Sequence, residues 1–168
     1  MRKITSLLML FCMCVGMAFA QITDLGQLSN DKTYFIESAR CFLMYSSAHS
    51  GNLATSNGTT VPAEDKVKNP VENENQQFII LNEGGSYYLY SVGAGKYVNK
   101  SGNYVDTPTD ALTITNIGSG GSYPWKILIG GNGLNSQDPN QTEAGVVVNT
   151  WTDTDAGNCF KIIAIEDI

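Results

Sequence analysis

The residues best suited to chemistry lie close together near the end of the chain. Residues 146–163 read VVVNTWTDTDAGNCFKII, which places Trp151 between two β-rich runs and just before the acidic pair Asp153 and Asp155. Such a stretch could be a calcium loop, a redox site around Cys159, or the end of a repeated binding unit. Each possibility makes a different demand on the neighbouring residues.

The acidic pair imitates the start of a calcium loop. An EF-hand loop that began at Asp153 would need glycine at its sixth position and a bidentate glutamate at its twelfth. Glycine stands instead at the fifth position, as Gly157, and Ala164 occupies the twelfth. Asp and Gly are also the residues that tight turns select. We therefore predict a turn here, with no metal and no other cofactor.

Enzymatic constellations are scarce in this sequence. The chain has one histidine, His49, within SAHSGN, so a Ser-His-Asp or Cys-His site could use only this residue. The acids lie mainly in predicted turns, and no two stand out as the pair that glycoside hydrolysis requires. The sequence thus predicts no catalytic residue and a protein that is not an enzyme.

The first twenty residues have the pattern of a secretory signal. They start with the basic residues Arg2 and Lys3, continue with an apolar stretch and end on the small-x-small residues 18–20. The apolar stretch is shorter than the roughly 20 residues that a spanning helix needs. We predict cleavage before Gln21, a secreted, periplasmic or cell-surface location, and no membrane span in the mature chain.

Loss of this segment would leave an acidic chain. Of 168 residues, 168 − 20 = 148 remain, and Lys plus Arg falls from 10 to 8 against 16 acids, so the formal charge changes from −6 to −8. Only one arginine, Arg40, is left. Because phosphate contacts need clustered basic residues, nucleic acid and anionic membrane are excluded as partners. The length suits one domain, residues 21–168.

The pattern along the mature chain is that of an all-β protein. No segment sustains a helical apolar period, and β-branched and aromatic runs alternate with turn residues, as in sandwiches and barrels. The sequence predicts twelve short strands, at 33–38, 41–46, 52–56, 76–81, 86–92, 96–100, 103–107, 111–116, 124–129, 133–136, 146–151 and 159–165.

These strands fall into three loosely similar units. The segments TYFIES, SYYLYS and YPWKIL can be placed in register, and each precedes three further strands. The fourth strands QQFIIL and NCFKII share a polar-x-Phe-x-Ile pattern, whereas DALTIT keeps only the alternation. Three four-strand units, approximately 33–81, 86–116 and 123–165, indicate a β-trefoil, a six-stranded barrel closed at one end by three hairpins.

With this pattern of strands, the chain resembles a known family, the ricin-B-type β-trefoil domains and especially their small secreted bacterial members. The resemblance lies in DKTYFIESAR, QQFIILNEGGSYYLYSVGAGKYV and WTDTDAGNCFKI, and it covers almost all of the mature chain. The Gln-x-Trp mark of lectin repeats is reduced to Gln76-Gln77-Phe78 and Asn158-Cys159-Phe160, and the middle repeat lacks it. The resemblance implies a non-catalytic, lectin-like module that binds a glycan or polysaccharide.

The resemblance also implies which residues would hold a sugar. A sugar site needs an aromatic face for the C–H surface of the ring and polar groups for adjacent hydroxyls. The third repeat offers the best set, which is Asn135, Asp138, Trp151 and Asn158. The second repeat offers a weaker set, which is Asn99, Tyr104 and Asp106. The first repeat could supply only Tyr45 and Gln76, because its third strand, NLATS, has no aromatic residue.

The two cysteines of the mature chain, Cys41 and Cys159, are disulfide candidates. The first and last strands of a trefoil pair with each other, which would bring Cys159 close to the end of the first strand, just before Cys41. A bond would close a loop of more than a hundred residues and add roughly 2–4 kcal/mol. The alternative is a pair of buried free thiols, and the sequence leaves both open.

A second function of another class also stays open. A protein-interaction trefoil such as a protease inhibitor would need a basic residue on a constrained loop, and Arg40 in SARCF is the best placed. The segment 57–75, rich in Pro, Asn and charged residues, interrupts the strand rhythm. We predict a mobile surface insertion there, with a specific binding loop as the alternative.

Overall fold

The structure is a computed structural model that describes residues 20–45, 51–59, 61–118, 122–137 and 148–165. These residues form thirteen strands and three short 3-10 helices, with no α-helix among them. The strands are β1 (Ala20–Gln21), β2 (Thr33–Ser38), β3 (Leu43–Tyr45), β4 (Leu53–Thr55), β5 (Phe78–Glu83), β6 (Ser86–Ser91), β7 (Lys96–Val98), β8 (Tyr104–Val105), β9 (Leu112–Asn116), β10 (Trp125–Ile129), β11 (Asn132–Leu134), β12 (Val148–Asn149) and β13 (Phe160–Ile165). The helices are η1 (Leu25–Gln27), η3 (Glu64–Lys66) and η4 (Glu74–Gln76).

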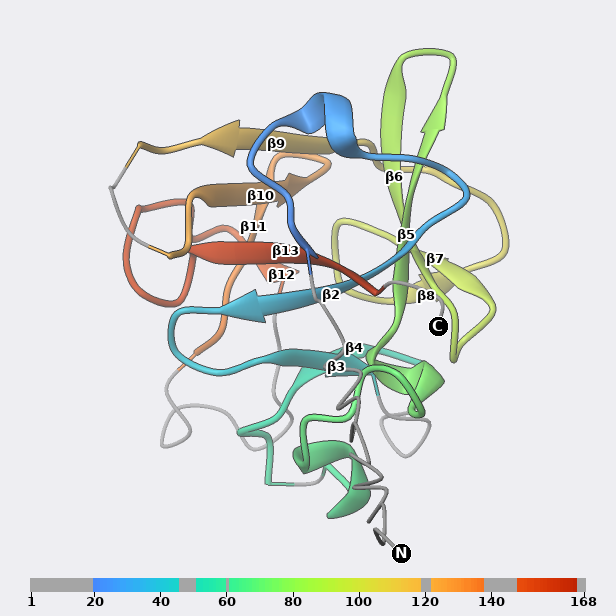
Figure 1. The fold of residues 1–168 in the computed structure, drawn as a ribbon, viewed down its shortest axis with the longest axis vertical. Helices are drawn as coiled ribbons and strands as arrows, with labels where there is room; N and C mark the ends of the chain where they lie inside the picture. The colour runs from blue at the N-terminus through green and yellow to red at the C-terminus, as the bar shows by residue number, and fades with distance from the viewer. Residues whose placement is uncertain (1–19, 46–50, 60, 119–121, 138–147, 166–168) are drawn as a thin grey trace, which may run out of the picture.

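Six of the strands close into a barrel (Figure 1). Their order is β13-β2-β5-β6-β9-β10, and a further pairing of β10 with β13 completes the circle. Three short hairpins, β3–β4, β7–β8 and β11–β12, accompany the barrel. All twelve predicted strands are present, and β1 is additional. The predicted six-stranded barrel with three hairpins is therefore confirmed.

The strand pairing repeats three times, although the residues differ. The strand pairs β13–β2, β5–β6 and β9–β10 are equivalent, because each aligns its inward-facing residues in the same register. The first equivalent pairs are Phe160↔Ser38, Phe78↔Ser91 and Leu112↔Ile129. The next are Ile162↔Ile36, Ile80↔Leu89 and Ile114↔Ile127. The repeat that is only loosely visible in the sequence is therefore clear in the core, whose strand pairs are related by a near-threefold symmetry.

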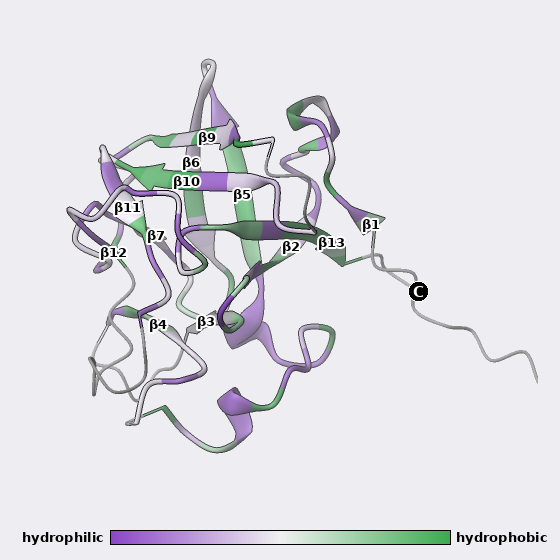
Figure 2. Cartoon of the chain, turned by 90° about the vertical axis from the view of Figure 1, so that its left-hand side faces the viewer, coloured by the Kyte–Doolittle hydropathy of each residue, from purple (hydrophilic) through white to green (hydrophobic). Residues whose placement is uncertain are grey.

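The core lies inside the barrel, and all three repeats contribute side chains to it. Phe78, Phe160 and Ile129 are fully buried, and buried residues alternate with less buried ones along β5, β10 and β13, which carry many apolar residues (Figure 2). The leader after residue 20 is tied to this core, because Ile22 is buried and its carbonyl accepts a hydrogen bond of 2.8 Å from the Trp125 indole nitrogen. Within the described residues, no helix has the length and apolarity to cross a membrane.

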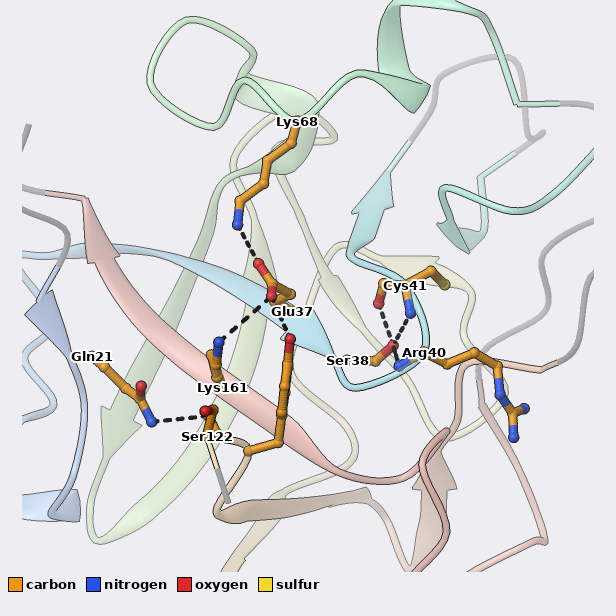
Figure 3. Close-up of polar contacts among 9 residues, drawn as sticks. Gln21, Glu37, Ser38, Arg40, Cys41, Lys68, Ser122 and Lys161 are labelled. Carbon is orange, nitrogen blue, oxygen red and sulfur yellow. Dashed lines mark hydrogen bonds and ion pairs between the residues drawn. The ribbon is translucent and has the colours of Figure 1, made fainter.

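A lysine of the insertion 57–75, for which the composition predicts a mobile surface segment, forms an ion pair with the barrel. Lys68 of the insertion pairs with Glu37 of β2, as Figure 3 shows. Glu37 also accepts a hydrogen bond of 2.7 Å from the Tyr123 hydroxyl, and Lys161 of β13 lies 3.8 Å from it. One carboxylate therefore joins the first strand, the insertion, the last strand and the segment before β10.

This cluster makes the stability of the fold depend on pH, both in acid and in alkaline solution. Burial alone would raise the pKa of Glu37, but the hydrogen bonds from Lys68 and Tyr123 and the nearby lysine charges outweigh it, so this pKa lies below its ordinary 4.5. Burial, followed by the bond to Glu37, raises the pKa of Tyr123 from 10.0 to about 12. The carboxylate's contribution to stability is complete above pH 4.5 and is lost as pH falls further. The tyrosine's contribution is complete below pH 10 and is lost toward pH 12.

We expect Glu37→Gln to weaken both dependences. The variant should be less stable than the native chain at pH 7, and its urea midpoint should change less between pH 4.5 and the acid limit. Its Tyr123 should also ionise at lower pH, seen as tyrosinate absorbance. Thr113→Gln, at an exposed position on the outside of β9, serves as a control. Equal acid sensitivity of Glu37→Gln and native protein would contradict the assignment.

Candidate functional site

The predicted third-repeat site is organised around a buried carboxamide. Asn158 is 1% exposed and lies two residues before the core residue Phe160. Its Oδ1 accepts a hydrogen bond from Nδ2 of Asn135, and its own Nδ2 donates to the carbonyl of Asp153. Asn135 is likewise buried, at 4% exposure. These two predicted ligands therefore hold each other and the turn, and present little surface to solvent.

Trp151 stands outside this buried pair. Its side chain is 52% exposed, although it follows the β-rich run that ends in β12. Its backbone nitrogen donates to Oδ1 of Asn149 at 2.8 Å, and its indole nitrogen lies 3.3 Å from Oδ2 of Asp155. The indole is thus available at the surface and held by a carboxylate from the next turn.

Asp155 is the residue that joins these parts, and the sequence indicated only its role in a turn. Its Oδ1 accepts from the backbone nitrogens of Gly157 at 2.8 Å and Asn158 at 3.1 Å, which is how Asp shapes a tight connection. The predicted turn is present. The signal that could have linked Asp155 to Trp151 is their four-residue separation across it.

Two glycines let the backbone segments of the site approach closely. A Cβ on Gly133 of β11 would lie 2.0 Å from the carbonyl oxygen of Trp151. A Cβ on Gly157 would lie 2.6 Å from the carbonyl oxygen of Ser136. Larger residues at either position would push the tryptophan segment away from the barrel. Trp151 is exposed because its backbone, and not its side chain, packs against β11.

An exposed indole next to a carboxylate and a rigid turn has the groups needed to bind a sugar ring. The indole face can cover the C–H surface of a sugar ring, and Asp155 and neighbouring backbone groups can bond its hydroxyls. The fourth predicted ligand, Asp138, lies outside the described residues. Among the described residues, no cluster of His, Cys, Asp or Glu is suited to hold a metal ion. His49, the only histidine, is also outside them.

The weaker second-repeat set is not arranged as a site. Oδ1 of Asn99 accepts from the backbone nitrogens of Ser101 and Asn103, so it stabilises a turn. Tyr104 of β8 packs against the barrel core. Asp106 is exposed and pairs with Lys96 at 2.8 Å. The three side chains thus serve three separate structural contacts. In the first repeat, Gln76 is fully buried, and the side chain of Tyr45 is outside the description.

Comparison with solved structures identifies the architecture. A ricin B-like lectin from Macrolepiota procera in complex with lactose superposes with a TM-score of 0.58 at 17% identity, over 82% of this chain and 97% of that one. A designed threefold-symmetric protein, ThreeFoil, matches with a TM-score of 0.52 at 15% identity, over 78% and 97%. The fold is a β-trefoil. The Macrolepiota procera lectin and ThreeFoil share this fold with the chain.

One match is an enzyme of greater length. An endo-β-galactosidase from Clostridium perfringens that releases GlcNAcα1-4Gal matches with a TM-score of 0.58 at 11% identity, over 80% of this chain. The trefoil spans about a third of that enzyme, 33%. No protein-family model matches the chain, and no curated protein matches it. At these identities the likeness shows the fold alone.

The disulfide candidates Cys41 and Cys159 are free thiols in this structure. The strand pairing does bring them to the same corner, because the Cys159 carbonyl accepts from Ala39 and the Cys41 carbonyl accepts from Ser38. However, the Cys159 thiol donates to the Asp155 carbonyl at 3.0 Å, and the Cys41 thiol contacts the Ser136 hydroxyl. Burial, and then the Asp155 charge, raises the pKa of Cys159.

Arg40, the residue on which the protease-inhibitor alternative depends, is exposed in the turn after β2. One arm of its guanidinium donates to the Ser136 carbonyl at 2.7 Å, and the turn is tightened by the hydroxyl of Ser38. Arg40 therefore braces the third repeat against the first. This contact gives the residue a structural role, and no described feature favours protease binding over it.

A hollow beside the insertion is a feature that the sequence did not indicate. It has a volume of about 760 Å³ and lies among the acids and amides of residues 64–75 together with Gly93. Its innermost acid, Asp65, is 3% exposed and accepts hydrogen bonds from Nδ2 of Asn73 at 2.8 Å and of Asn75 at 3.3 Å. Its carboxylate is thus occupied in folding the insertion.

Proposed function

We propose that this protein is a secreted, non-catalytic carbohydrate-binding module of the ricin-B-like kind. The observation that carries the proposal is the exposed indole of Trp151, held by Asp155 over a turn whose polar groups are fixed by Asn135 and Asn158. An aromatic platform with adjacent fixed polar groups is what sugar recognition requires. The trefoil fold, shared with a lectin in complex with lactose, supports it.

The charge of the chain limits the class of sugar. The formal charge is −6, and Asp153 and Asp155 lie next to the platform. Repulsion from these carboxylates disfavours uronic and sialic acids, so the ligand is a neutral sugar. A single shallow site binds weakly unless copies or a neighbouring domain add avidity. The signal-like residues 1–20 support secretion, and cleavage before Gln21 would leave β13 its pairing with Gln21.

Trp151→Ala should lower the affinity for a neutral glycan by about 10–100-fold, because stacking contacts worth about 1.4–2.8 kcal/mol disappear. A glycan array would identify the ligand, and isothermal titration would give the change. Trp151→Phe should keep part of the affinity, since the ring stays while the bond to Asp155 is lost.

Val67 provides the matched control, because it is the other large apolar residue that is exposed among the described residues, at 64%. Val67→Ala should leave binding unchanged. Equal binding by Trp151→Ala and native protein would remove Trp151 from the site.

A further inference from the structure

The outer side of the β5–β6 strand pair carries an unusual set of side chains. Ile80 and Leu89 point into the barrel and belong to its core. Their strand neighbours therefore point outward, and so do Tyr97 and Val105 on the adjoining hairpin. We call this set the outer tyrosine face, and its members are Ile79, Leu81, Tyr88, Tyr90, Tyr97 and Val105. All six are half-buried, and none packs against either buried apolar cluster of the described residues.

The outer tyrosine face is continuous across four strands. Tyr90 stands opposite Ile79 on one side and opposite Tyr97 on the other, and Tyr97 stands opposite Val105. The rings of Tyr90 and Tyr97 meet edge to face, with 5.2 Å between their centroids and 78° between their planes. Tyr88, opposite Leu81, extends the face toward the hairpin tip, which projects beyond the rest of the barrel in Figures 1 and 2.

The face ends in hydrogen-bonding groups. The hydroxyl of Tyr97 donates to Oε1 of Glu83 at 3.2 Å, and Glu83 stands opposite Ser86 at the tip. Glu83 is exposed, so its second oxygen can accept from a ligand. The face thus offers ring surfaces and apolar carbons in its middle and fixed hydroxyl and carboxylate oxygens at its end.

The near-threefold symmetry shows that the fold does not need such a face. The four positions held by Ile79, Tyr90, Leu81 and Tyr88 correspond in β9–β10 to Thr113, Leu128, Thr115 and Lys126. In β13–β2 they correspond to Lys161, Glu37, Ile163 and Phe35. Only β5–β6 has four apolar or aromatic residues at these positions.

Where an aromatic residue does occur on an equivalent outer position, the chain covers it. Phe35 is 1% exposed, because the Phe42 ring lies 5.8 Å from it and the Lys68 ammonium lies 5.0 Å above it. The members of the outer tyrosine face are only half-buried by comparison, so part of each side chain stays open to an external partner.

The size of the face limits what that partner is. Six half-buried side chains leave at most roughly 400 Å² open, given the 150–250 Å² that a whole aromatic side chain presents. A stable interface between two proteins needs about 800 Å² from each partner. The open area suits a narrow ligand with alternating apolar and hydroxylated surfaces. Tyrosine rings can pack against the apolar parts of such a ligand, and tyrosine hydroxyls can form hydrogen bonds with its hydroxyl groups.

We propose that the outer tyrosine face is a second carbohydrate-binding surface on β5, β6 and β7, which takes an unbranched, neutral polysaccharide chain along β6. The rings of Tyr88 and Tyr90, which stand about 7 Å apart along the strand, cover the C–H faces of successive sugar units. Tyr97, Glu83 and Ser86 bond their hydroxyls. The ligand class rests on the function proposed above, whereas the surface is independent of Trp151.

The sister strand pair provides the variant that tests this proposal. Leu81→Thr combined with Tyr88→Lys copies Thr115 and Lys126, which the barrel already accommodates at the equivalent positions. The substitutions are made in the full chain with and without Trp151→Ala, and Lys126→Ala is the matched control. Retardation in gels that contain β-glucan, xylan or galactomannan measures binding, with polygalacturonate as the acidic comparison. Size-exclusion chromatography gives the oligomeric state.

The Trp151→Ala chain should still be retarded by at least one of the neutral polysaccharides. The added pair Leu81→Thr/Tyr88→Lys should weaken that retardation by about tenfold or more, and Lys126→Ala should not. If Trp151→Ala alone abolishes all binding, the second surface is refuted and the proposed function stands. If only the double substitution abolishes it, the Trp151 site is refuted and this surface stands. A native dimer that the double substitution converts to monomer would show a contact between copies and overturn the proposal.

Discussion

Asn158→Leu is expected to lower the free energy of unfolding by about 2–4 kcal/mol and to abolish binding at the Trp151 site. The carboxamide is buried, accepts from Asn135 and donates to the Asp153 carbonyl. Leucine has a similar volume but leaves the buried amide of Asn135 unpaired, at about 1–3 kcal/mol, and removes the hydrogen bond that holds the carbonyl of the exposed Asp153. Urea unfolding gives the stability, and titration with the glycan that the native protein binds gives the affinity.

Two comparisons make this result specific. Asn116→Leu, at an exposed asparagine of β9 whose side chain accepts from the Gly118 backbone nitrogen, should cost less than about 1 kcal/mol. Asn135→Leu removes the same hydrogen bond from the other side, so the double variant with Asn158→Leu should lose less than the sum of the two. Additive losses would mean that the two amides do not act as a pair.

Most of the barrel could be predicted because its physical cause is local. Alternation of apolar and polar residues sets which side of a strand is buried, and turn residues set where strands end. Strand β2 begins and ends as predicted. Strand β5 was expected at 76–81 and lies at Phe78–Glu83, because Gln76 and Gln77 bond the insertion instead of a neighbouring strand. A contact of this kind between a side chain and a distant backbone group leaves no periodic pattern in the sequence, so it could not be predicted.

The site was less predictable because it depends on contacts between distant segments. The residue types around Trp151 indicated sugar recognition, but the same pattern would fit an indole buried in the core. Its exposure follows from the close approach of Gly133, which is 18 residues away in sequence (151 − 133). Likewise, Asn135 and Asn158 were predicted as ligands by resemblance, and their burial depends on the packing of β11 beside the last turn.

The structure also gives the Gln-x-Trp position a physical meaning that the sequence did not. Two residues before the first core residue of each fourth strand stand Gln76, Asp110 and Asn158. Asp110 accepts from the Lys100 backbone nitrogen at 3.1 Å, so all three side chains hold a preceding segment of chain. The middle repeat thus keeps the role with a carboxylate, although the sequence pattern suggested that it lacked this feature.

Gln76→Leu is expected to have the second large effect, a loss of about 2–4 kcal/mol. The carboxamide is fully buried, accepts from the Asn69 nitrogen at 2.9 Å and donates to the Val67 carbonyl at 2.7 Å. Leucine leaves these two backbone groups without partners. The insertion should then open locally, and trypsin should cleave after Lys66 and Lys68 faster than in the native chain.

Gln77→Leu is the matched control, because it is the same substitution one residue later. Gln77 is only half-buried, whereas Gln76 is fully buried, and Gln77 donates to the carbonyls of Pro70 and Val71. Its cost should be about 1 kcal/mol, and cleavage after Lys66 should change little. If both variants lose the same stability, burial at position 76 does not decide the cost. If the urea midpoint of Gln76→Leu equals that of the native chain, the ion pair between Glu37 and Lys68, and not the Gln76 carboxamide, holds the insertion.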